Sequence, residues 1–478
     1  MSMSSVGMVY TAGLGQFLDI YLASSRARIS GLESQRDALD MKTAIYTDLK
    51  SKLSTLRDLA EDMAAGGTLS AFGAKSTTSS DADVLTATAG AGAVAMAHTI
   101  HIEQLARAHS VLSGRYTSAA TDLSAAHAGT KSFTITVDGT DYDVSLTINS
   151  GDTNEDVLAA IAQAINDVAD IPVRASRIDD TDSTSKLYIA GNETGTENKM
   201  TFTDTDGLLA ALGVTNASAS TDTVGGYIYA DLGGNELDAK LTVDGVSIIR
   251  SSNSVSDVLT GVTLTLLNEQ EAADADITMT VSIDTDTIKS KVEEFFEVYN
   301  DAYEYLSSKI SVDTTTYTRG ALAGDYSYVN LWQNMRSLMA GIVSTVAGGN
   351  YSGLSQIGIS STSTGSFSIS DADDFVAALT EHLDDVEDLF NSAGGIATAL
   401  EDLVDDYSSA AGIVWTSKDA VSSNIDRLDD QIDRLEQLQD LKQEELIKQY
   451  GASQQAMYMQ QVMLSMISSM NSWIQGSY

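Results

Sequence analysis

The C-terminal stretch from Ser417 to Trp473 constrains the fold of this chain more than any other. Its apolar residues recur mostly at steps of three, four or seven, the spacing of one stripe on a helix. The stripe consists of Ile425, Leu428, Ile432, Leu435, Leu438, Leu441, Leu446, Tyr450, Met457, Leu464, Ile467 and Met470. A single helix here would measure about 85 Å at about 1.5 Å per residue, which no compact domain needs. The stretch therefore predicts a rod that packs its stripe against another helix.

Charged side chains separate the stripe positions as far as Lys448, and none follows before the end of the chain. The uncharged part is rich in methionine, with Met457, Met459, Met463, Met466 and Met470. A long surface helix that packs on its own domain is one interpretation. The uncharged end favours a rod that assembles with other subunits, because an interface buried on all sides does not tolerate unpaired charge.

The N-terminal end has the same order of features. Residues 1–18 carry no charge, and a helical pattern runs from Arg26 to about Ala65, where Gly66 and Gly67 end it. The simplest arrangement pairs the two ends in one bundle, and two separate helical regions are the alternative. In an isolated subunit we expect the ends to be disordered, since a lone stripe has nothing to pack against.

Between these ends, residues 76–283 are rich in Ser, Thr, Gly and Asp and follow the alternation of strands. Val84–Ala89 and His98–Leu105 are expected to be two strands joined across a run of small residues. The segment Phe133–Gly139 recurs as Ala239–Gly245, and each copy predicts a strand that ends in an Asp-Gly turn.

An Asp-Val-Leu sequence follows each copy of the repeat. In the first copy it begins a predicted helix from Asn154 to Val168, with Thr153 or Asn154 as the N-cap. In the second copy the chain returns to a strand at Val262–Leu267. We therefore expect two β-rich modules, one nested in the other.

Helices resume after the β-rich segment. Four are expected over Ile288–Leu306, Tyr326–Val346, Leu383–Phe390 and Ile396–Tyr407, and a further one is capped by Asp371 after a short strand at Ser366–Ser370. The predicted fold is α+β and multidomain, with paired terminal helices and two nested β-rich head domains. Its divisions are 1–40 (terminal segment), 41–75 with 284–416 (α-rich leg), 76–117 with 238–283 (β-rich head), 118–237 (inserted α+β head) and 417–478 (C-terminal coiled-coil helix).

Composition limits the partners and the export route. The 67 acidic and 27 basic side chains give a net charge of -40, which disfavours nucleic acid and anionic membranes. There is no cysteine, and Pro172 is the one proline. No stretch has the length of a membrane-spanning helix, and the first eighteen residues lack the features of a cleaved signal. A cytoplasmic place or export without a cleaved signal is expected.

No motif supports catalysis, cofactor binding or metal binding. The histidines are His98, His101, His109, His127 and His382. His98 and His101 resemble a metal pair, but residues three apart on a strand face opposite sides. Asp179, Asp180 and Asp182 lack the glycine and glutamate of a calcium loop and predict a solvated turn. Gly13-Leu14-Gly15 precedes no βαβ unit. We assign no catalytic, cofactor or metal residue and no enzyme activity.

The chain resembles the flagellar hook-associated protein 2 family of filament cap proteins. The most specific similarity lies in Leu241–Val246, Arg250-Ser251-Ser252-Asn253 and Gly261–Leu266. Further similar stretches are Tyr46–Leu59, Val84–Ser110 with Gln104-Leu105-Ala106, Tyr299-Asn300, Leu322–Asp325 and Leu354–Ile369. Residues 131–206 resemble an insert module shared with flagellin-type proteins. The chain departs from the family around Ile20–Arg26, where it is shorter, and at Tyr450, where phenylalanine is common.

The resemblance implies a secreted structural protein at the distal tip of the flagellum. Such a protein is exported through the flagellar secretion system, forms a ring-shaped homo-oligomer, prevents the loss of flagellin and promotes its polymerisation. Flagellin, hook–filament junction proteins and an export chaperone are the expected partners. The alternatives are a tip adhesin for mucin or other surfaces, and another axial protein of the flagellum such as a junction protein or flagellin itself.

Overall fold

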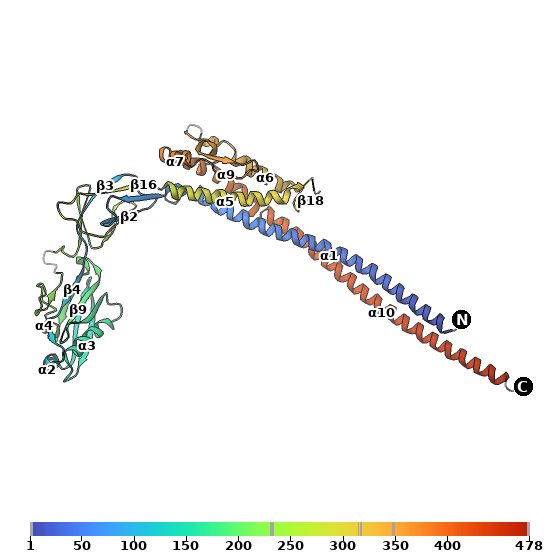
Figure 1. Ribbon diagram of the computed structural model, residues 1–478, viewed down its shortest axis with the longest axis horizontal. Coiled ribbons are helices and arrows are strands. Elements are labelled where there is room, and N and C mark those ends of the chain that lie inside the picture. Colours follow the sequence, from blue (N-terminus) through green and yellow to red (C-terminus); the bar gives the residue numbers. More distant parts are fainter. Residues whose placement is uncertain (1–2, 230–233, 314, 316–317, 347–348, 476–478) are drawn as a thin grey trace. The chain divides into compact units, whose positions relative to one another are not determined.

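The computed structural model describes residues 3–229, 234–313, 315, 318–346 and 349–475. The chain divides into two compact units. The helical unit combines residues up to 65 with residues from 289 onward, and the β-rich unit comprises residues 66–288. Figure 1 shows that both ends of the chain belong to the helical unit. Within the described ranges, none of the helices has the length and apolar character needed to span a membrane.

The helical unit contains two long helices and several shorter elements. Its helices are α1 (Met3–Ala64), most of α5 (Thr285–Ile310), α6 (Tyr326–Met339), α7 (Ala372–Glu381), α8 (Leu383–Asn391), α9 (Ile396–Ser408) and α10 (Ile413–Gln475). Two small hairpins, β17 (Val312–Asp313) with β18 (Thr318–Arg319) and β19 (Ile359–Ser361) with β20 (Phe367–Ile369), complete it.

The core of the helical unit is formed by one apolar stripe on each of the helices α1 and α5. On α5 the fully buried residues are Val292, Phe295, Phe296, Tyr299, Tyr303 and Leu306, and on α1 they are Tyr46, Leu49, Leu53, Leu56, Ala60 and Met63. Asp371 caps α7, as expected, and accepts hydrogen bonds from the backbone N–H groups of Asp373 and Asp374. These packed stripes hold the short helices against one end of the two long ones (Figure 1).

Three expectations for the helical unit are wrong in detail. The N-terminal helix begins at Met3 rather than near Arg26, and the ends expected to be disordered are helical throughout the described residues. The helix expected to reach Val346 ends at Met339, and a turn at Gly341 follows. The reason for the first difference is that residues 3–18 contain no charged residue, so the alternation of apolar and charged residues that locates the helix is absent there.

The first core of the β-rich unit lies between two sheets. One sheet has the order β1-β16-β3-β12-β13 and the other β14-β15-β2. Their strands are β1 (Lys75–Ser79), β2 (Leu85–Ala89), β3 (Ala97–Gln104), β12 (Ala239–Val243), β13 (Val246–Arg250), β14 (Ser254–Leu259), β15 (Val262–Leu266) and β16 (Ile277–Ile283). The two predicted strands β2 and β3 do not pair with each other, because β2 pairs with β15 and β3 pairs with β12 and β16.

A second core of the β-rich unit is built from residues 111–214. Its sheets have the orders β10-β6-β7 and β11-β4-β9-β5, and β8 also pairs with β9. The elements are β4 (Ala108–Leu112), β5 (Tyr116–Thr117), α2 (Asp122–His127), β6 (Gly129–Val137), β7 (Thr140–Ile148), α3 (Asn154–Asn166), β8 (Val173–Thr181), β9 (Thr184–Thr194), β10 (Thr201–Asp204), α4 (Leu208–Leu212) and β11 (Gly226–Tyr227). Thr153 is the N-cap of the predicted helix α3.

The repeated Asp-Gly sequence forms the same turn twice. Asp138 and Gly139 connect β6 to β7, and Asp244 and Gly245 connect β12 to β13. All four residues have positive φ, between 46° and 79°. Two consecutive positive φ angles define the two-residue hairpin turn whose twist matches antiparallel strands. The prediction that each copy of the repeat is a strand ending in an Asp-Gly turn is therefore confirmed.

The two turns differ in one respect that gives a prediction. Asp244 Oδ1 accepts a hydrogen bond from the Thr99 backbone N–H at 2.9 Å, and Asp244 Oδ2 lies 2.7 Å from Nδ1 of buried His98. Within the part of the chain that is described, the Asp138 carboxylate has no such bond. We expect Asp244→Ala to destabilise the β-rich unit by about 1–3 kcal/mol more than Asp138→Ala, because the buried side chain of His98 is left unpaired. Both variants share the cost of alanine at positive φ, so calorimetric unfolding isolates the hydrogen bonds; equal losses would contradict the prediction.

The family-like residues join the two cores. The Asn253 side chain donates to the Ala106 carbonyl at 2.9 Å and accepts from the Ala106 N–H at 2.7 Å. The Gln104 amide donates to the carbonyls of Glu236 and Asp238. Thr194 Oγ1 donates to the Ser251 carbonyl at 2.6 Å. The Gln104 and Thr194 bonds hold the two crossings of the chain between one core and the other, and the Asn253 bonds hold the segment of the first core next to them.

Candidate functional site: the paired terminal helices

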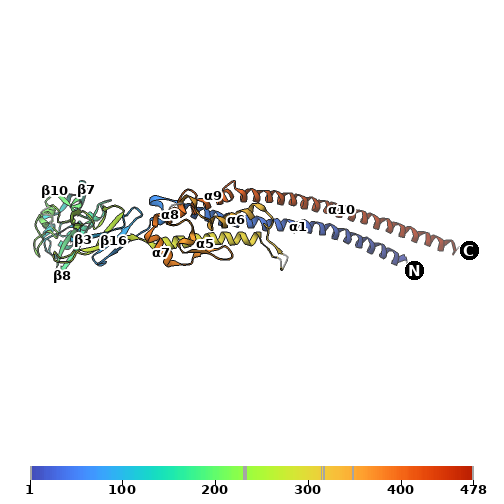
Figure 2. The ribbon, with the colours of Figure 1, turned by 90° about the horizontal axis from the view of Figure 1, so that it is seen from above.

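The two long helices α1 and α10 lie side by side and antiparallel (Figures 1 and 2). Arg36 Nη1 lies 3.6 Å from Asp429 Oδ1, and Lys418 Nζ donates to Thr47 Oγ1 at 3.0 Å. A residue nearer the N-terminus of α1 therefore lies opposite a residue nearer the C-terminus of α10, by the same number of residues. The expectation that the two ends pair in one bundle is confirmed.

Packing between the two helices changes along their length. Near the short helices, α10 contributes the buried residues Val414, Val421, Leu428 and Ile432. Farther out, Gln439 occupies the stripe that faces α1, and its Oε1 is buried without a hydrogen-bond partner among the described residues. A pocket of about 510 Å³ opens between the helices at this level, with Arg26, Glu33, Glu436 and Asp440 in its lining. The outer part of the pair is therefore held by fewer buried apolar contacts.

The predicted stripe of α10 is partly wrong at this level. Leu438 is 56% exposed and Leu441 is 64% exposed, so they do not face α1. The α1-facing positions are instead half-buried and include Leu435, Gln439, Leu446, Tyr450 and Met457. Steps of three from Leu435 to Leu441 rotate the stripe away from its starting face, because a helix needs 3.6 residues per turn. Leu438 and Leu441 begin a second apolar stripe on the outside of the pair.

Among the described residues, no helix of the same subunit lies opposite the end of α10. At the register of the two polar contacts, Met3 lies opposite about Val462, and Figures 1 and 2 both show α10 continuing past the start of α1. The overhang, Met463–Trp473, is exposed along its whole length, including the indole of Trp473 at 76%. A helix this apolar and this exposed needs a partner that the isolated subunit does not provide.

Four methionines form a separate face on the same end of α10. Met459, Met463, Met466 and Met470 follow one another at steps of four, three and four, and each is 61–62% exposed. At 100° per residue, the stripe lies about half a turn from half-buried Met457, which belongs to the α1-facing side. We call these four residues the methionine stripe. Sequence reasoning listed the methionines but did not separate the two faces, although the 4-3-4 spacing was the available signal.

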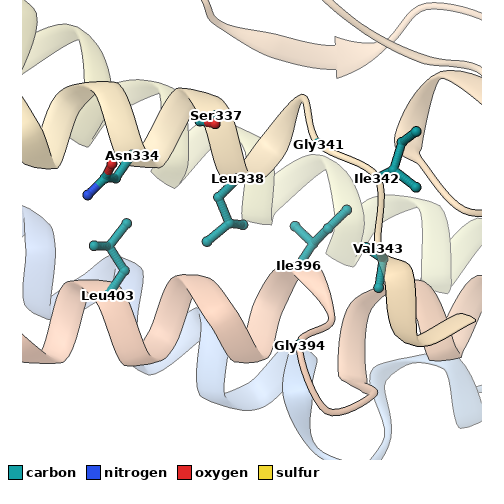
Figure 3. Close-up of a pocket in the computed structure, with 9 residues that line it drawn as sticks. All are labelled: Asn334, Ser337, Leu338, Gly341, Ile342, Val343, Gly394, Ile396 and Leu403. Atoms are coloured by element: carbon teal, nitrogen blue, oxygen red, sulfur yellow. The ribbon is translucent and has the colours of Figure 1, made fainter.

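A groove between α6 and α9 is another concave feature of the helical unit. It has a volume of about 430 Å³ and is lined by Asn334, Ser337, Leu338, Gly341, Ile342, Val343, Gly394, Ile396 and Leu403. Figure 3 shows Leu338 pointing from α6, and Ile396 and Leu403 pointing from α9, into this groove. None of the lining side chains is a carboxylate, histidine, lysine or arginine. The groove therefore offers no general acid or base for catalysis.

The residues considered for metal binding have structural partners. His98 is buried beside Asp244, and His101 lies on the other face of β3, 3.3 Å from Asp276 Oδ1. Among the described residues no cluster of histidine and carboxylate side chains has the geometry of a metal site. Asp180 is not in a solvated turn, because it lies in β8 with Arg115 and Lys186 beside it. The hydrogen bond from the Thr184 hydroxyl holds the pKa of Asp180 below its usual range, and Arg115 lowers it further.

His109 is the one histidine whose titration is strongly shifted among the described residues. It is fully buried on β4, and its Nδ1 accepts the Met200 backbone N–H at 3.0 Å. Burial, with Lys199 as the second cause, lowers the pKa of His109 from 6.5 to about 4. The unfolded chain therefore binds a proton before the folded chain does as the pH falls.

The shifted histidine predicts an acid-sensitive β-rich unit. The contribution of neutral His109 is fully present above about pH 6.5 and is lost as the pH falls to about 4, a total of about 3 kcal/mol. We expect His109→Leu to flatten the pH dependence of calorimetric unfolding in this range, and His127→Leu on the surface helix α2 to leave it unchanged. Parallel slopes for the wild type and His109→Leu would refute this explanation.

Comparison with known proteins agrees with this organisation. The fold is that of a multidomain α+β protein whose terminal helices carry an uncovered apolar surface, as in a protein that assembles into a larger structure. Residues 14–109 match the family model described as flagellar hook-associated protein 2 N-terminus, and residues 237–462 match the model for its C-terminus. The chain belongs to the flagellar hook-associated protein 2 family. The inserted core of residues 111–214 lies between the two matched regions.

Two relatives and one solved structure illustrate the similarity. The flagellar hook-associated protein 2 of Escherichia coli K12 is 28% identical over 439 residues, 89% of each chain. The B-type flagellar hook-associated protein 2 of Pseudomonas aeruginosa PAO1 is 30% identical over 342 residues, 68% of each chain. The crystal structure of the D1–D2–D3 domains of the Escherichia coli flagellar cap protein has a TM-score of 0.59 and 26% identity, and covers 79% of this chain and 99% of that one.

Proposed function

We propose that the chain caps the distal end of the bacterial flagellar filament, where it keeps exported flagellin from escaping and promotes its polymerisation. The observation that carries the proposal is the uncovered end of α10 in a member of the cap-protein family. Apolar side chains exposed to this extent favour association with further helices. Copies of this chain, flagellin and hook–filament junction proteins are the proposed partners.

The proposed mechanism is mechanical and electrostatic rather than covalent. Rods of several subunits pack their uncharged ends together into a ring, and no catalytic residue or cofactor takes part. The charged outer face of α10 ends at Lys448, so the assembling surface is confined to the last part of the helix. A net charge of -40 keeps free subunits apart in solution until the ends meet.

The location of the protein and its route out of the cell follow from the same proposal. The chain leaves the cell through the flagellar secretion system without a cleaved signal and acts outside the cell at the tip of the flagellum. Before export, a chaperone covers the exposed end of α10. The finer division into 1–40, 41–75 with 284–416, 76–117 with 238–283, 118–237 and 417–478 is proposed as the domain organisation of the chain.

Complementation tests this function. A strain that lacks its own cap protein and secretes unpolymerised flagellin is supplied with this chain, and soluble flagellin in the medium is measured. We expect long filaments and little soluble flagellin. Filaments that stay absent while the chain is exported would overturn the proposal. The adhesin alternative is not favoured, since all three tryptophans lie in α6 and α10 and none lies in the β-rich unit, so that unit offers no indole on which a sugar ring could stack.

A further inference from the structure

The side chains of the methionine stripe can be oxidised, a property that apolar packing alone does not require. Met459, Met463, Met466 and Met470 each expose 61–62% of their surface, on the side of α10 opposite to α1. A thioether in water is open to oxidation, whereas a leucine at the same place would give similar apolar contact without that reactivity. Four neighbouring side chains on one face of the helix therefore each carry an oxidisable thioether.

Most other described methionines are protected by the fold. Met63, Met200, Met279, Met335 and Met339 are at most 1% exposed, so an oxidant in solution cannot reach them without unfolding. Met41 and Met96 are exposed, but each stands alone on its own surface. The stripe is thus the place where oxidation changes several neighbouring contacts at once.

We propose that the methionine stripe is a peroxide-sensitive modification site that switches off self-association of the free subunit. This inference rests on the proposed function, in which the same end of α10 packs against further copies. In the reaction, a sulfur lone pair attacks one oxygen of hydrogen peroxide and the O–O bond breaks. The sulfur gains that oxygen and loses two electrons, and the departing hydroxide takes the remaining proton to form water. The product is a sulfoxide, which is polar and accepts hydrogen bonds.

The switch follows from what surrounds the stripe. After Lys448 the chain has no charged side chain, and the polar neighbours of the stripe on α10 are uncharged: serine, glutamine, asparagine and Tyr458. A sulfoxide buried against apolar residues of another copy loses its hydrogen bonds to water, so each buried sulfoxide weakens association by about tenfold or more. Once copies have packed together the sulfurs are covered, so assembled material resists the same oxidant.

The experiment uses the full chain. Wild type and a variant with Met459→Leu, Met463→Leu, Met466→Leu and Met470→Leu are treated with hydrogen peroxide, and sulfoxides are mapped by peptide mass spectrometry. Self-association is followed by sedimentation velocity before treatment, after treatment and after reduction by methionine sulfoxide reductases. The five buried methionines serve as internal controls for unfolding. Met41 and Met96 remain oxidisable in the variant and show whether oxidation elsewhere is sufficient.

We expect wild type to lose association when the stripe is oxidised and to regain it on reduction, while the leucine variant associates under all conditions. Full oxidation of the stripe with unchanged association would overturn the inference. Equal inhibition of the leucine variant would also overturn it, because the sensitive site would then lie elsewhere. Untreated wild type that never associates would instead refute the proposed function, and this inference with it.

Discussion

Replacing Met463 and Met466 together by lysine is expected to abolish capping while leaving the subunit folded. Both side chains are more than 60% exposed in the subunit, so a lysine at either place is fully solvated there. In an assembly the same position is covered, and each buried ammonium then costs several kcal/mol unless it is paired. Two such charges weaken association by roughly a thousandfold or more, at about 1.4 kcal/mol per factor of ten.

The matched control replaces the same two residues by leucine, which keeps the surface apolar and the helix propensity high. Circular dichroism is expected to be the same for both variants, whereas soluble flagellin in the complemented strain is expected to rise only for the lysine variant. Sedimentation velocity measures the association directly. A lysine variant that assembles and caps normally would show that the methionine stripe is not an interface.

The second large effect concerns the core of the helical unit. Leu53 is completely buried on α1, in the part of α1 that packs against α9 and the start of α10. Leu53→Ala is expected to destabilise this unit by about 3–5 kcal/mol, because the lost apolar contacts are joined by the cost of the cavity. For a unit of this size the midpoint of thermal unfolding should fall by about 10 °C.

The chain provides both a control and a selective probe for this test. Leu438→Ala removes the same atoms from a side chain that is 56% exposed, and its effect is expected to stay within about 0.5 kcal/mol. Because Trp332, Trp415 and Trp473 all belong to the helical unit, tryptophan fluorescence reports the unfolding of that unit alone. Similar melting curves for the two leucine variants would disprove the assignment of Leu53 to the core.

Signals confined to a few neighbouring residues predicted local structure well. The Asp-Gly pairs at 138–139 and 244–245 form hairpin turns because few other sequences accept two positive φ angles. Thr153 and Asp371 cap helices because a short polar side chain satisfies the free N–H groups of the first turn. In each case the physical cause lies within four residues, so the chain's own sequence contains it.

Signals that depend on distant residues were less informative. The sequence did not indicate that β2 pairs with β15 rather than β3, because pairing depends on which strands the fold brings together across more than 170 residues. Nor did the spacing show which side of α10 meets α1. Leu438 and Leu441 fit a helical stripe equally well on either side, and only the contact with α1 distinguishes the two. The methionine stripe was missed although its 4-3-4 spacing is visible in the sequence.

Strands β1 and β16 run beside each other at the base of the β-rich unit, with Lys75 paired to Ile283 and the Asp284 N–H bonded to the Ala74 carbonyl. The polypeptide thus enters and leaves this unit through adjacent strands. A segment closed in this way behaves as a cassette: it can be exchanged, enlarged or removed between neighbouring attachment points without moving the helices that precede and follow it. Changes in the sequence or size of the β-rich unit are thereby separated from the helical unit.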